Sequence, residues 1–499
     1  MPMQHQAPVS DMAQQAASCE LPGRMFRAYD IRGIVGRDLT EDNIRVIGQA
    51  IGYLALSHGH NEVLFGADGR LSSPSLSAAL GEGILDSGCH IIDLGTIPTP
   101  LLYFATHTTD YHSGVMLTAS HNPADYNGIK IVRERSCLTS EEIQGIREQA
   151  CFFARRPDKV REPRLPRGSR RALDIMPAYI DRIRQDVKLK RPLRVVVDCG
   201  NAVPGLVAPS LYRALGCEVI ELYCQLDGSF PNHHPDPTIN VNLKDLVAQV
   251  KTHSADLGVA LDGDGDRVVL VTDQGRVMDT DRLLMLLVDQ ILPGYCATAE
   301  DRRPSVVFDV KCSSLLINRI QRCGGEPVMS RGGHSFMKHR MQETGAVVGG
   351  EFSAHVFIKD RWFGYDDGLY TAARFMEILA AGTATSDAML QSLPTSLVTP
   401  EIRIEVDESH KFELMTRLAE LAEFPAARVN TLDGIRADFD RGWGLVRASN
   451  TTPALLLRFE AETEDVMQRI QGEFRALLQR VDPILDFPLL TITDRQPDF

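Results

Sequence analysis

Three aspartates stand at alternate positions, Asp262, Asp264 and Asp266, with a glycine between each pair and apolar segments on both sides. Carboxylates this close together repel one another strongly unless a hard cation lies among them, and oxygen-only ligands suit Mg²⁺ or Ca²⁺. The β-like flanks favour Mg²⁺, because a Ca²⁺-binding EF-hand would need helical flanks, a glycine where Arg267 stands and a glutamate where Asp273 stands. An acidic turn with solvated carboxylates is the alternative.

A serine follows an apolar segment that we predict to be a strand. Residues 114–117 lead into a polar turn, residues 118–123, which contains Ser120 and ends in Asn-Pro. Open α/β folds place their sites at the carboxyl ends of parallel strands, so an exposed Ser120 could act as a nucleophile there. The surrounding residues do not form the Gly-x-Ser-x-Gly motif of hydrolases. A serine that only hydrogen-bonds its own turn is the alternative.

A third stretch, residues 447–453, combines one cation with small polar side chains. Arg447 is followed by Ser449, Asn450 and Thr451 in a segment of turn-forming residues. A fixed cation together with hydroxyl, amide and backbone N–H donors is a suitable cradle for a phosphate group. A hairpin loop without a ligand is the alternative.

A fourth stretch, residues 349–355, carries a carboxylate, a hydroxyl and an imidazole at alternate positions. These are Glu351, Ser353 and His355. In an extended strand the three side chains would share one face and could read the hydroxyl groups of a sugar.

Short apolar segments alternate with amphipathic helical segments along most of the chain, which predicts a βαβ arrangement repeated three times. After residue 394 the pattern changes to a smaller α+β unit with an antiparallel sheet. We therefore predict an α/β protein with three similar mixed α/β domains, each with a central sheet, and a fourth α+β domain. The predicted boundaries are a polar tail at 1–24 and domains at 25–166, 167–276, 277–394 and 395–499.

The composition excludes several classes of protein. With 499 residues, 43% hydrophobic and 24% charged, the chain is of the ordinary multidomain globular type. A net charge of −13 disfavours binding to nucleic acid or an anionic membrane, so an anionic substrate must be held by a local cluster of cations. The absence of a secretory signal, of a long apolar segment and of any Cys-x-x-Cys pair among the 10 cysteines predicts free thiols, no thiolate metal site and a cytoplasmic location.

Taken in order, these stretches closely resemble the α-D-phosphohexomutases, and in particular the bacterial phosphomannomutase/phosphoglucomutase group. The resemblance runs from about residue 26 to about residue 480 and includes the segments 26–33, 118–123, 230–237, 309–312 and 332–335. It implies four domains around one cleft, with one loop each for phosphoserine, metal, sugar and phosphate. The four stretches described above match those four loops.

The resemblance also implies a role for each residue. Ser120 would be the phosphorylated serine, and Asp262, Asp264 and Asp266, together with a phosphoserine oxygen, would hold Mg²⁺. Arg32, His121 and Lys130 would line the phosphoryl-transfer site, with Lys130 and His334 as the favoured general bases. The substrate would contact Tyr29, Arg267, Lys311, His334, Glu351, Ser353, His355, Arg447, Ser449, Asn450 and Thr451.

Two loops depart from the family pattern. The usual Glu-Met-Ser-Gly-His of the sugar loop has Phe352 and Ala354 in place of Met and Gly, and alanine adopts positive φ less readily than glycine. We therefore expect the sugar loop to adopt a slightly different position. Ala67 stands where the family often has arginine, so we also expect one contact that supports the serine loop to be missing.

The implied reaction interconverts hexose 1-phosphates and hexose 6-phosphates of mannose and glucose through phosphoserine and a hexose 1,6-bisphosphate, with glucose 1,6-bisphosphate as activator. We expect a monomer whose partner is a small phosphosugar, with no nucleic acid and no membrane. The alternatives are a phosphoglucosamine-type mutase, a Mg²⁺-dependent phosphatase and a non-catalytic protein that binds Mg²⁺ and phosphosugars.

Overall fold

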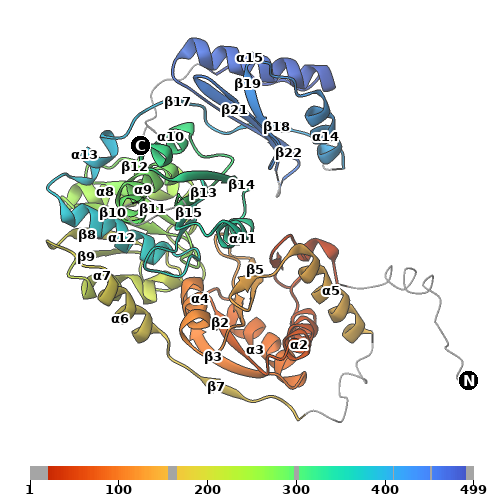
Figure 1. Ribbon diagram of the computed structural model, residues 1–499. Coiled ribbons are helices and arrows are strands. Elements are labelled where there is room, and N and C mark those ends of the chain that lie inside the picture. Colours follow the sequence, from red (N-terminus) through yellow and green to blue (C-terminus); the bar gives the residue numbers. More distant parts are fainter. Residues whose placement is uncertain (1–20, 156–165, 297–302, 408, 450–451, 491–499) are drawn as a thin grey trace, which may run out of the picture.

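The computed structural model describes residues 21–155, 166–296, 303–407, 409–449 and 452–490. Its four sheets follow one another along the chain and form four domains (Figure 1). Part of the predicted polar tail is structured, because Leu21 is buried in the core of domain 1 and Gly23–Met25 form a 3-10 helix.

Domain 1 is a three-layer unit with a mixed sheet in the order β1-β5-β4-β2-β3-β7, and β6 pairs with β5. Helices α2, α3 and α5 cover one face with a core of their own, while α4 lies in a second core that is shared with the next two domains. The elements of domain 1 are β1 (Ile31–Ile34), α2 (Glu41–Ser57), β2 (Glu62–Ala67), α3 (Ser73–Asp86), β3 (His90–Thr96), α4 (Thr99–Thr108), β4 (Gly114–Leu117), β5 (Tyr126–Arg133), β6 (Ser136–Cys137), α5 (Ser140–Ala154) and β7 (Arg170–Ala172).

Domain 2 has a sheet in the order β12-β11-β10-β8-β9, in which β8, β9 and β10 are parallel and β11 and β12 are antiparallel to their neighbours. Strands β10 and β11 are buried along their whole length and rich in valine and leucine, as strands covered on both faces are. The elements of domain 2 are α6 (Met176–Asp186), β8 (Arg194–Asp198), α7 (Ala208–Ala214), β9 (Glu218–Leu222), α8 (Lys244–Thr252), β10 (Leu257–Leu261), β11 (Val268–Thr272) and β12 (Val277–Met278).

Domain 3 repeats this plan with the order β14-β13-β15-β16, in which only β16 is antiparallel to its neighbour. The central helix α12 is buried on nearly every side, which agrees with its apolar sequence. The elements of domain 3 are α9 (Thr280–Cys296), β13 (Ser305–Asp309), α10 (Ser314–Arg322), β14 (Glu326–Ser330), α11 (His334–Thr344), β15 (Val348–Gly350), β16 (Val356–Ile358), α12 (Gly368–Ala381) and α13 (Ser386–Gln391).

Domain 4 has the predicted antiparallel sheet, in the order β17-β22-β21-β20-β19 with β18 also paired to β22. It has a separate hydrophobic core and lies at the top of Figure 1. The elements of domain 4 are β17 (Leu397–Val398), β18 (Ile402–Glu405), α14 (Lys411–Leu421), β19 (Ala427–Asn430), β20 (Ile435–Phe439), β21 (Gly442–Ala448), β22 (Ala454–Ala461) and α15 (Glu464–Val481).

Two predicted boundaries differ from the sheets by a few residues. Strand β7 lies beyond the predicted boundary at residue 166, yet it pairs with β3 and completes the sheet of domain 1. All three of its residues are exposed and two are arginines, so no apolar pattern marks it as a strand. Strand β12 pairs with β11 and therefore belongs to domain 2, although the predicted boundary at residue 276 precedes it.

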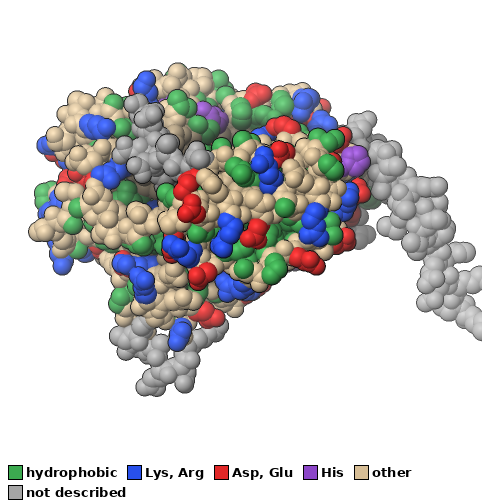
Figure 2. All heavy atoms as spheres, turned by 90° about the horizontal axis from the view of Figure 1, so that it is seen from above, with side chains coloured by type: hydrophobic (Ala, Val, Ile, Leu, Met, Phe, Trp, Pro, Cys, Tyr) green, Lys and Arg blue, Asp and Glu red, His purple; other side chains and the backbone are tan. Residues whose placement is uncertain are grey.

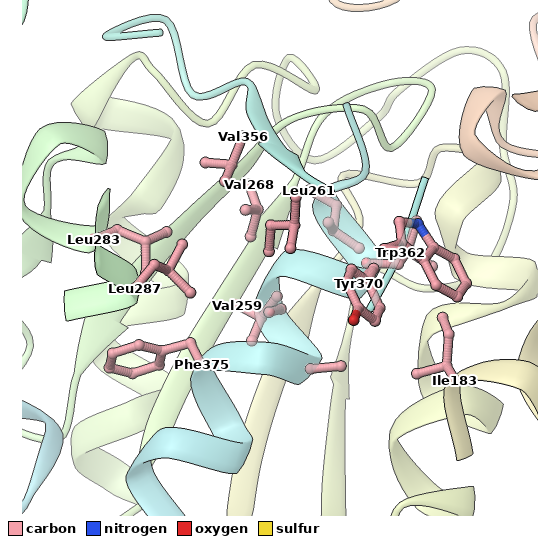
Figure 3. Packing of buried hydrophobic residues seen from close by; sticks show 14 of the residues in the cluster. Ile183, Val259, Leu261, Val268, Leu283, Leu287, Val356, Trp362, Tyr370 and Phe375 are labelled. Carbon is pink, nitrogen blue, oxygen red and sulfur yellow. The ribbon is translucent and has the colours of Figure 1, made fainter. Parts of the chain in front are cut away.

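Domains 1, 2 and 3 share one continuous hydrophobic core, and part of it is drawn in Figure 3. Aromatic side chains join the elements within it: Trp362 stacks on Tyr370 with ring centroids 4.2 Å apart, and Phe104 of α4 stacks on Trp362 at 5.8 Å. Domain 4 meets this body through a small apolar cluster of Val310, Trp443 and Leu445. The first three domains therefore form one packed body, and the fourth is attached by fewer apolar contacts.

The described cysteines partly agree with the predicted free thiols. Seven are free, and of these only Cys323 is not fully buried. Cys151 is disulfide-bonded, so the prediction is wrong at that position. On the face shown in Figure 2, basic and acidic side chains are interspersed.

The close packing of α2 on α3 generates a stability prediction. A Cβ atom on Gly83 would lie 2.0 Å from the backbone oxygen of Arg45, whereas a Cβ atom on Gly145, in α5, meets nothing within 4 Å. Gly83→Ala should therefore destabilise domain 1 by about 1–3 kcal/mol through overpacking. Gly145→Ala should stabilise it by about 0.5–1 kcal/mol, because glycine is unfavourable inside a helix. Scanning calorimetry of the full chain measures both, and equal melting temperatures for the two variants would contradict the packing argument.

Candidate active site

Ser120 lies in the turn that follows β4 and faces the acidic loop of domain 2. Its hydroxyl donates to Asp262 Oδ2 at 2.7 Å and lies 3.1 Å from His121 Nδ1. Ser120 is buried, although we expected an exposed residue from the sequence. Its φ is 51°. A left-handed conformation is unfavourable for a residue other than glycine, and such strain is typical of functional turns.

Arg70 supports the serine turn through hydrogen bonds to its backbone. Its guanidinium donates to four backbone carbonyls of the turn, those of Ser120, Asn122, Pro123 and Tyr126, at 2.6–3.1 Å. Asp68 accepts a further bond from Arg70 Nε at 3.2 Å. Burial lowers the pKa of Arg70, in spite of the opposing charge of Asp68. Arg70 thus gives the turn substantial support, in spite of the contact that we expected Ala67 to leave missing.

The acidic loop joins β10 to β11 and approaches the serine turn closely. Asp262, Asp264 and Asp266 are buried, and each offers one oxygen within 4.8 Å of the others. A Cβ atom on Gly263 would lie 2.2 Å from the carbonyl oxygen of Ser120, and Gly265 has a φ of 78°. Glycine is therefore required at both positions, once for close approach and once for the backbone conformation.

Lys130 of β5 compensates two of the three carboxylates. Its Nζ donates to Asp264 Oδ2 at 2.6 Å and to Asp266 Oδ2 at 2.5 Å. Thr99, at the start of α4, also donates its hydroxyl to Asp264 Oδ2, at 2.5 Å. Burial lowers the pKa of Lys130, but the charges of Asp264 and Asp266 outweigh it and raise that pKa well above its ordinary value.

The pKa values of Asp262 and Asp264 consequently shift in opposite directions. Burial and then the charges of Asp266 and Asp264 raise the pKa of Asp262 well above its ordinary value. Burial also raises the pKa of Asp264, but the charge of Lys130 and the bonds from Lys130 and Thr99 outweigh it and lower that pKa to about 2. The repulsion predicted from the sequence is thus concentrated on Asp262.

The three aspartates fit a Mg²⁺ ion. Among the described residues, Asp264 Oδ1 and Asp266 Oδ1 are buried and have no hydrogen-bond partner. Burying a carboxylate oxygen without a partner is unfavourable, and a hard cation would satisfy both oxygens. A second group with similar spacing, Asp266, His355 and Asp366, does not fit a cation. His355 Nε2 accepts a bond from Arg267 Nε at 3.0 Å, so Nδ1 carries the proton, 3.1 Å from Asp366.

The sugar-loop candidates lie in a turn between β15 and β16, not in an extended strand. Ser353 donates to Glu351 Oε2 at 2.9 Å, while His355 faces Asp366 and Arg267. The predicted common face of the three side chains is therefore wrong, because strand β15 ends at Gly350 and the chain turns through Ala354, whose φ is 73°.

Residues of domains 1 and 3 meet next to this turn. The ring of Tyr29 packs edge-on against His334, the first residue of α11, with centroids 4.7 Å apart. Arg32 donates to Asn122 Oδ1 and Asp30 Oδ2, at 2.5 Å each. Burial and nearby cations lower the pKa values of His121 and His334 well below their ordinary value, so both imidazoles are neutral at pH 7.

The phosphate-loop candidates lie in domain 4. Arg447 at the end of β21 pairs with Asp433, with Nη2 and Oδ2 3.1 Å apart. Ser449 is buried, and its Oγ accepts a bond from the backbone N–H of Thr452 at 3.2 Å. Asn450 and Thr451 lie outside the described residues. Lys311 of domain 3 pairs with Asp309 at 3.3 Å.

The structure therefore connects the predicted loops through a series of contacts: Ser120 to Asp262, Arg267 to His355, Tyr29 to His334, and the Gly332 backbone to Asp433. Sequence reasoning missed Arg70, Thr99 and Asp433. Arg70 stands near Asp68 after a predicted strand, but nothing in the sequence of any of the three indicates its distant partner.

The support of the serine turn by Arg70 can be tested by hydrogen exchange. Arg70→Lys keeps a cation beside Asp68 but cannot reach four carbonyls. We expect the protected amides of Asn122 and Tyr126 to exchange about thirtyfold faster, equivalent to about 2 kcal/mol of lost hydrogen bonding. The control is Arg170→Lys, because Arg170 forms a more exposed ion pair with Asp93. Equal protection of the serine turn in both variants would contradict the role of Arg70.

Four family models match the chain in order. Their descriptions are phosphoglucomutase/phosphomannomutase alpha/beta/alpha domain I at residues 23–151, domain II at 177–275, domain III at 279–397 and the C-terminal domain at 401–477. None of the helices that the structure describes combines the length and apolar character needed to span a bilayer.

Two curated relatives and one solved structure cover nearly the whole chain. The phosphomannomutase/phosphoglucomutase of Pseudomonas aeruginosa is 49% identical over 472 residues, which are 94% of this chain and 98% of the relative. The phosphoglucomutase of Neisseria gonorrhoeae is 46% identical over 469 residues, 93% and 98% of the two chains. A crystal structure of a phosphoglucomutase/phosphomannomutase family protein from Burkholderia thailandensis has a TM-score of 0.86 at 40% identity and covers 93% of this chain and 99% of its own.

Proposed function

Because this chain belongs to the phosphoglucomutase/phosphomannomutase family, we infer that it is an intramolecular phosphotransferase that interconverts the 1-phosphates and 6-phosphates of mannose and glucose. The observation that carries this inference is the 2.7 Å bond from the Ser120 hydroxyl to Asp262. A hydroxyl that can carry a phosphoryl group thus lies against three carboxylates that fit Mg²⁺.

The reaction requires a group that carries phosphate, because O1 and O6 of one hexose are too far apart for direct transfer. Phosphorylated Ser120 gives its phosphoryl group to the free hydroxyl of the substrate and leaves a hexose 1,6-bisphosphate. The bisphosphate turns over so that its other phosphate faces Ser120, and Ser120 takes that phosphate back. The burial of Ser120 limits access of water to the phosphoserine between these steps.

The residues around Ser120 supply charge for this transfer. Asp262, Asp264, Asp266 and an oxygen of phosphoserine would hold Mg²⁺, which when bound neutralises charge on the transferring phosphoryl group. Arg32 stands beside Asn122 in the serine turn, and Arg267 lies 4.0 Å from Asp262 Oδ2. Both guanidinium groups can stabilise the developing negative charge.

We assign the role of general base to His334. Burial lowers its pKa, and neither ring nitrogen has a hydrogen-bond partner among the described residues, so a neutral imidazole is available to accept a proton. Lys130 is the other residue favoured from the sequence, but in its present contacts with Asp264 and Asp266 it holds its proton.

The remaining candidates bind the substrate. We propose that the Glu351 carboxylate accepts hydrogen bonds from the sugar hydroxyls and that the Ser353 hydroxyl donates hydrogen bonds to them. Tyr29, Lys311 and His355 would also contact the sugar. Arg447 and Ser449, together with Asn450 and Thr451, would hold whichever phosphate is not reacting. Since a bisphosphate that escapes leaves Ser120 unphosphorylated, we also propose activation by glucose 1,6-bisphosphate. We also propose that the enzyme is a monomer and that it is located in the cytoplasm.

A coupled assay with mannose 1-phosphate, glucose 1-phosphate and glucosamine 1-phosphate tests the function. Mannose and glucose phosphates should be converted to 6-phosphates without release of inorganic phosphate. Preference for glucosamine 1-phosphate would favour the phosphoglucosamine-type alternative, and release of inorganic phosphate would favour a phosphatase. Binding without turnover would favour a non-catalytic protein.

Ser120 should carry phosphate in the purified protein, because its hydroxyl lies beside the proposed metal ligands. Intact-mass measurement and peptide mapping check this after incubation with glucose 1,6-bisphosphate. Ser120→Ala is the control and should lack the added mass. A peptide containing Ser120 that is never phosphorylated, in protein that nevertheless turns over, would exclude the phosphoserine mechanism.

Asp264→Asn and Asp262→Asn should differ in stability although both weaken Mg²⁺ binding and turnover. Asp264 has its pKa lowered from 3.8 to about 2, so its charge contributes about 2 kcal/mol above pH 3.8, and this contribution is lost as the pH falls through 2. In excess EDTA at pH 7, Asp264→Asn should therefore lower the free energy of unfolding by about 2 kcal/mol. Asp262→Asn should not lower it, because the carboxylate that suffers the repulsion is removed. Calorimetry in excess EDTA measures the stability of both variants. A less stable Asp262→Asn than Asp264→Asn would contradict the assigned contacts.

A further inference from the structure

We propose that Asp433 is a positioning residue that orients the phosphate-binding Arg447 and couples it to the turn beside the sugar-binding Glu351. This inference rests on the proposed function, because it takes the roles of Arg447 and Glu351 from there. Asp433 belongs to none of the sequence patterns described above. It lies in domain 4, in the turn before β20.

Asp433 holds one edge of the Arg447 guanidinium. Its Oδ1 accepts from Nη2 at 3.2 Å and from Nε at 3.4 Å, and its Oδ2 lies 3.1 Å from Nη2. Nη1 has no hydrogen-bond partner within the part of the chain that the structure describes. The second edge of the guanidinium therefore stays available for a phosphate, and an arginine held at one edge loses less rotational freedom when it binds at the other.

The contact is built into the local backbone. Gly434, the next residue, has a φ of 84°, and a Cβ atom on it would lie 2.3 Å from the Val446 carbonyl oxygen and 2.6 Å from Cβ of Arg447. A glycine thus lets the turn of Asp433 lie directly against the strand of Arg447. Both charged side chains are mostly buried, with 15% of Asp433 and 11% of Arg447 exposed, so the pair is shielded from solvent.

Asp433 also crosses to domain 3. Its Oδ2 accepts from the backbone N–H of Gly332 at 3.1 Å, and the next backbone N–H, that of Gly333, donates to Glu351 Oε1 at 2.6 Å. Two consecutive amides therefore bind two carboxylates, one beside the proposed phosphate site and one in the proposed sugar site. A shift of domain 4 that moves Asp433 is transmitted to the turn that holds Glu351.

Two substitutions separate the two contacts. Asp433→Asn can keep an oxygen acceptor for Gly332 but places an amide donor against the guanidinium. Asp433→Ala removes both contacts. The control is Glu462→Gln, which breaks an exposed ion pair with Arg441 in the same domain.

We expect Asp433→Asn to weaken glucose 1-phosphate binding, measured by titration calorimetry, and to raise KM about tenfold, the value of one charge-assisted contact. The kcat should change less than about twofold, because the phosphate that Arg447 holds is present in ground and transition states alike. Asp433→Ala should in addition lower kcat, through Glu351. Glu462→Gln should leave all three quantities unchanged.

The same substitutions in an Arg447→Ala background complete the test. Asp433→Asn should then have no further effect on Kd or KM, because its action requires the guanidinium. An unchanged Kd in the single variant, or an equal loss with and without Arg447, would overturn the positioning role. Identical kcat values for Asp433→Asn and Asp433→Ala would overturn the coupling to Glu351. If the unmodified protein binds but does not turn over hexose phosphates, the proposed function fails, while the Kd comparison still decides the role of Asp433.

Discussion

Three buried carboxylates in one loop impose the constraint on which the rest of the site depends. Isolated charges cannot be buried without compensation, and here Lys130 from domain 1 pairs with Asp264 and Asp266, while Asp262 accepts the hydroxyl of Ser120. The compensating groups come from another domain, so the acidic loop is stable only when domains 1 and 2 are packed together. The shared core of the first three domains meets that requirement.

Domain 4 is attached to the rest of the molecule in a different way. Its own core is separate, and polar bonds add to the small apolar cluster that joins it to domain 3. Arg436 donates to the carbonyls of Val310 and Cys312, and Ser313 donates to Glu460. Few apolar contacts need to be broken for such a domain to move, whereas the acidic loop cannot tolerate movement. A rigid site for the proposed phosphoryl transfer, together with a proposed phosphate-binding loop on a separately folded domain, would suit an intermediate that must turn over without leaving.

The sequence predicted much of the fold because its strands are apolar and bounded by polar turns, as residues 257–261 and 268–272 are. It could not predict β7, whose Arg170 and Arg171 are exposed and which is held by backbone bonds to β3. The residue types of the site were also visible in the sequence, but their partners were not. Lys130 is 134 residues from Asp264, and Arg70 is 50 residues from Ser120, so only the folded chain brings each pair together.

The sugar loop shows how contacts can outweigh local preference. Ala354 adopts a φ of 73°, a conformation that costs an alanine about 1–2 kcal/mol. Its carbonyl accepts from the N–H of Val268 at 3.1 Å, and its N–H donates to the backbone carbonyl of Glu351 at 3.1 Å, so both of its backbone groups are used. Its methyl group is buried in an apolar cluster with Val269 and Val271. Phe352, the other departure, lies under the guanidinium of Arg458 from domain 4, at 3.5 Å. The loop therefore takes its shape from domains 2 and 4, which ties the position of Glu351 to the arrangement of the whole molecule.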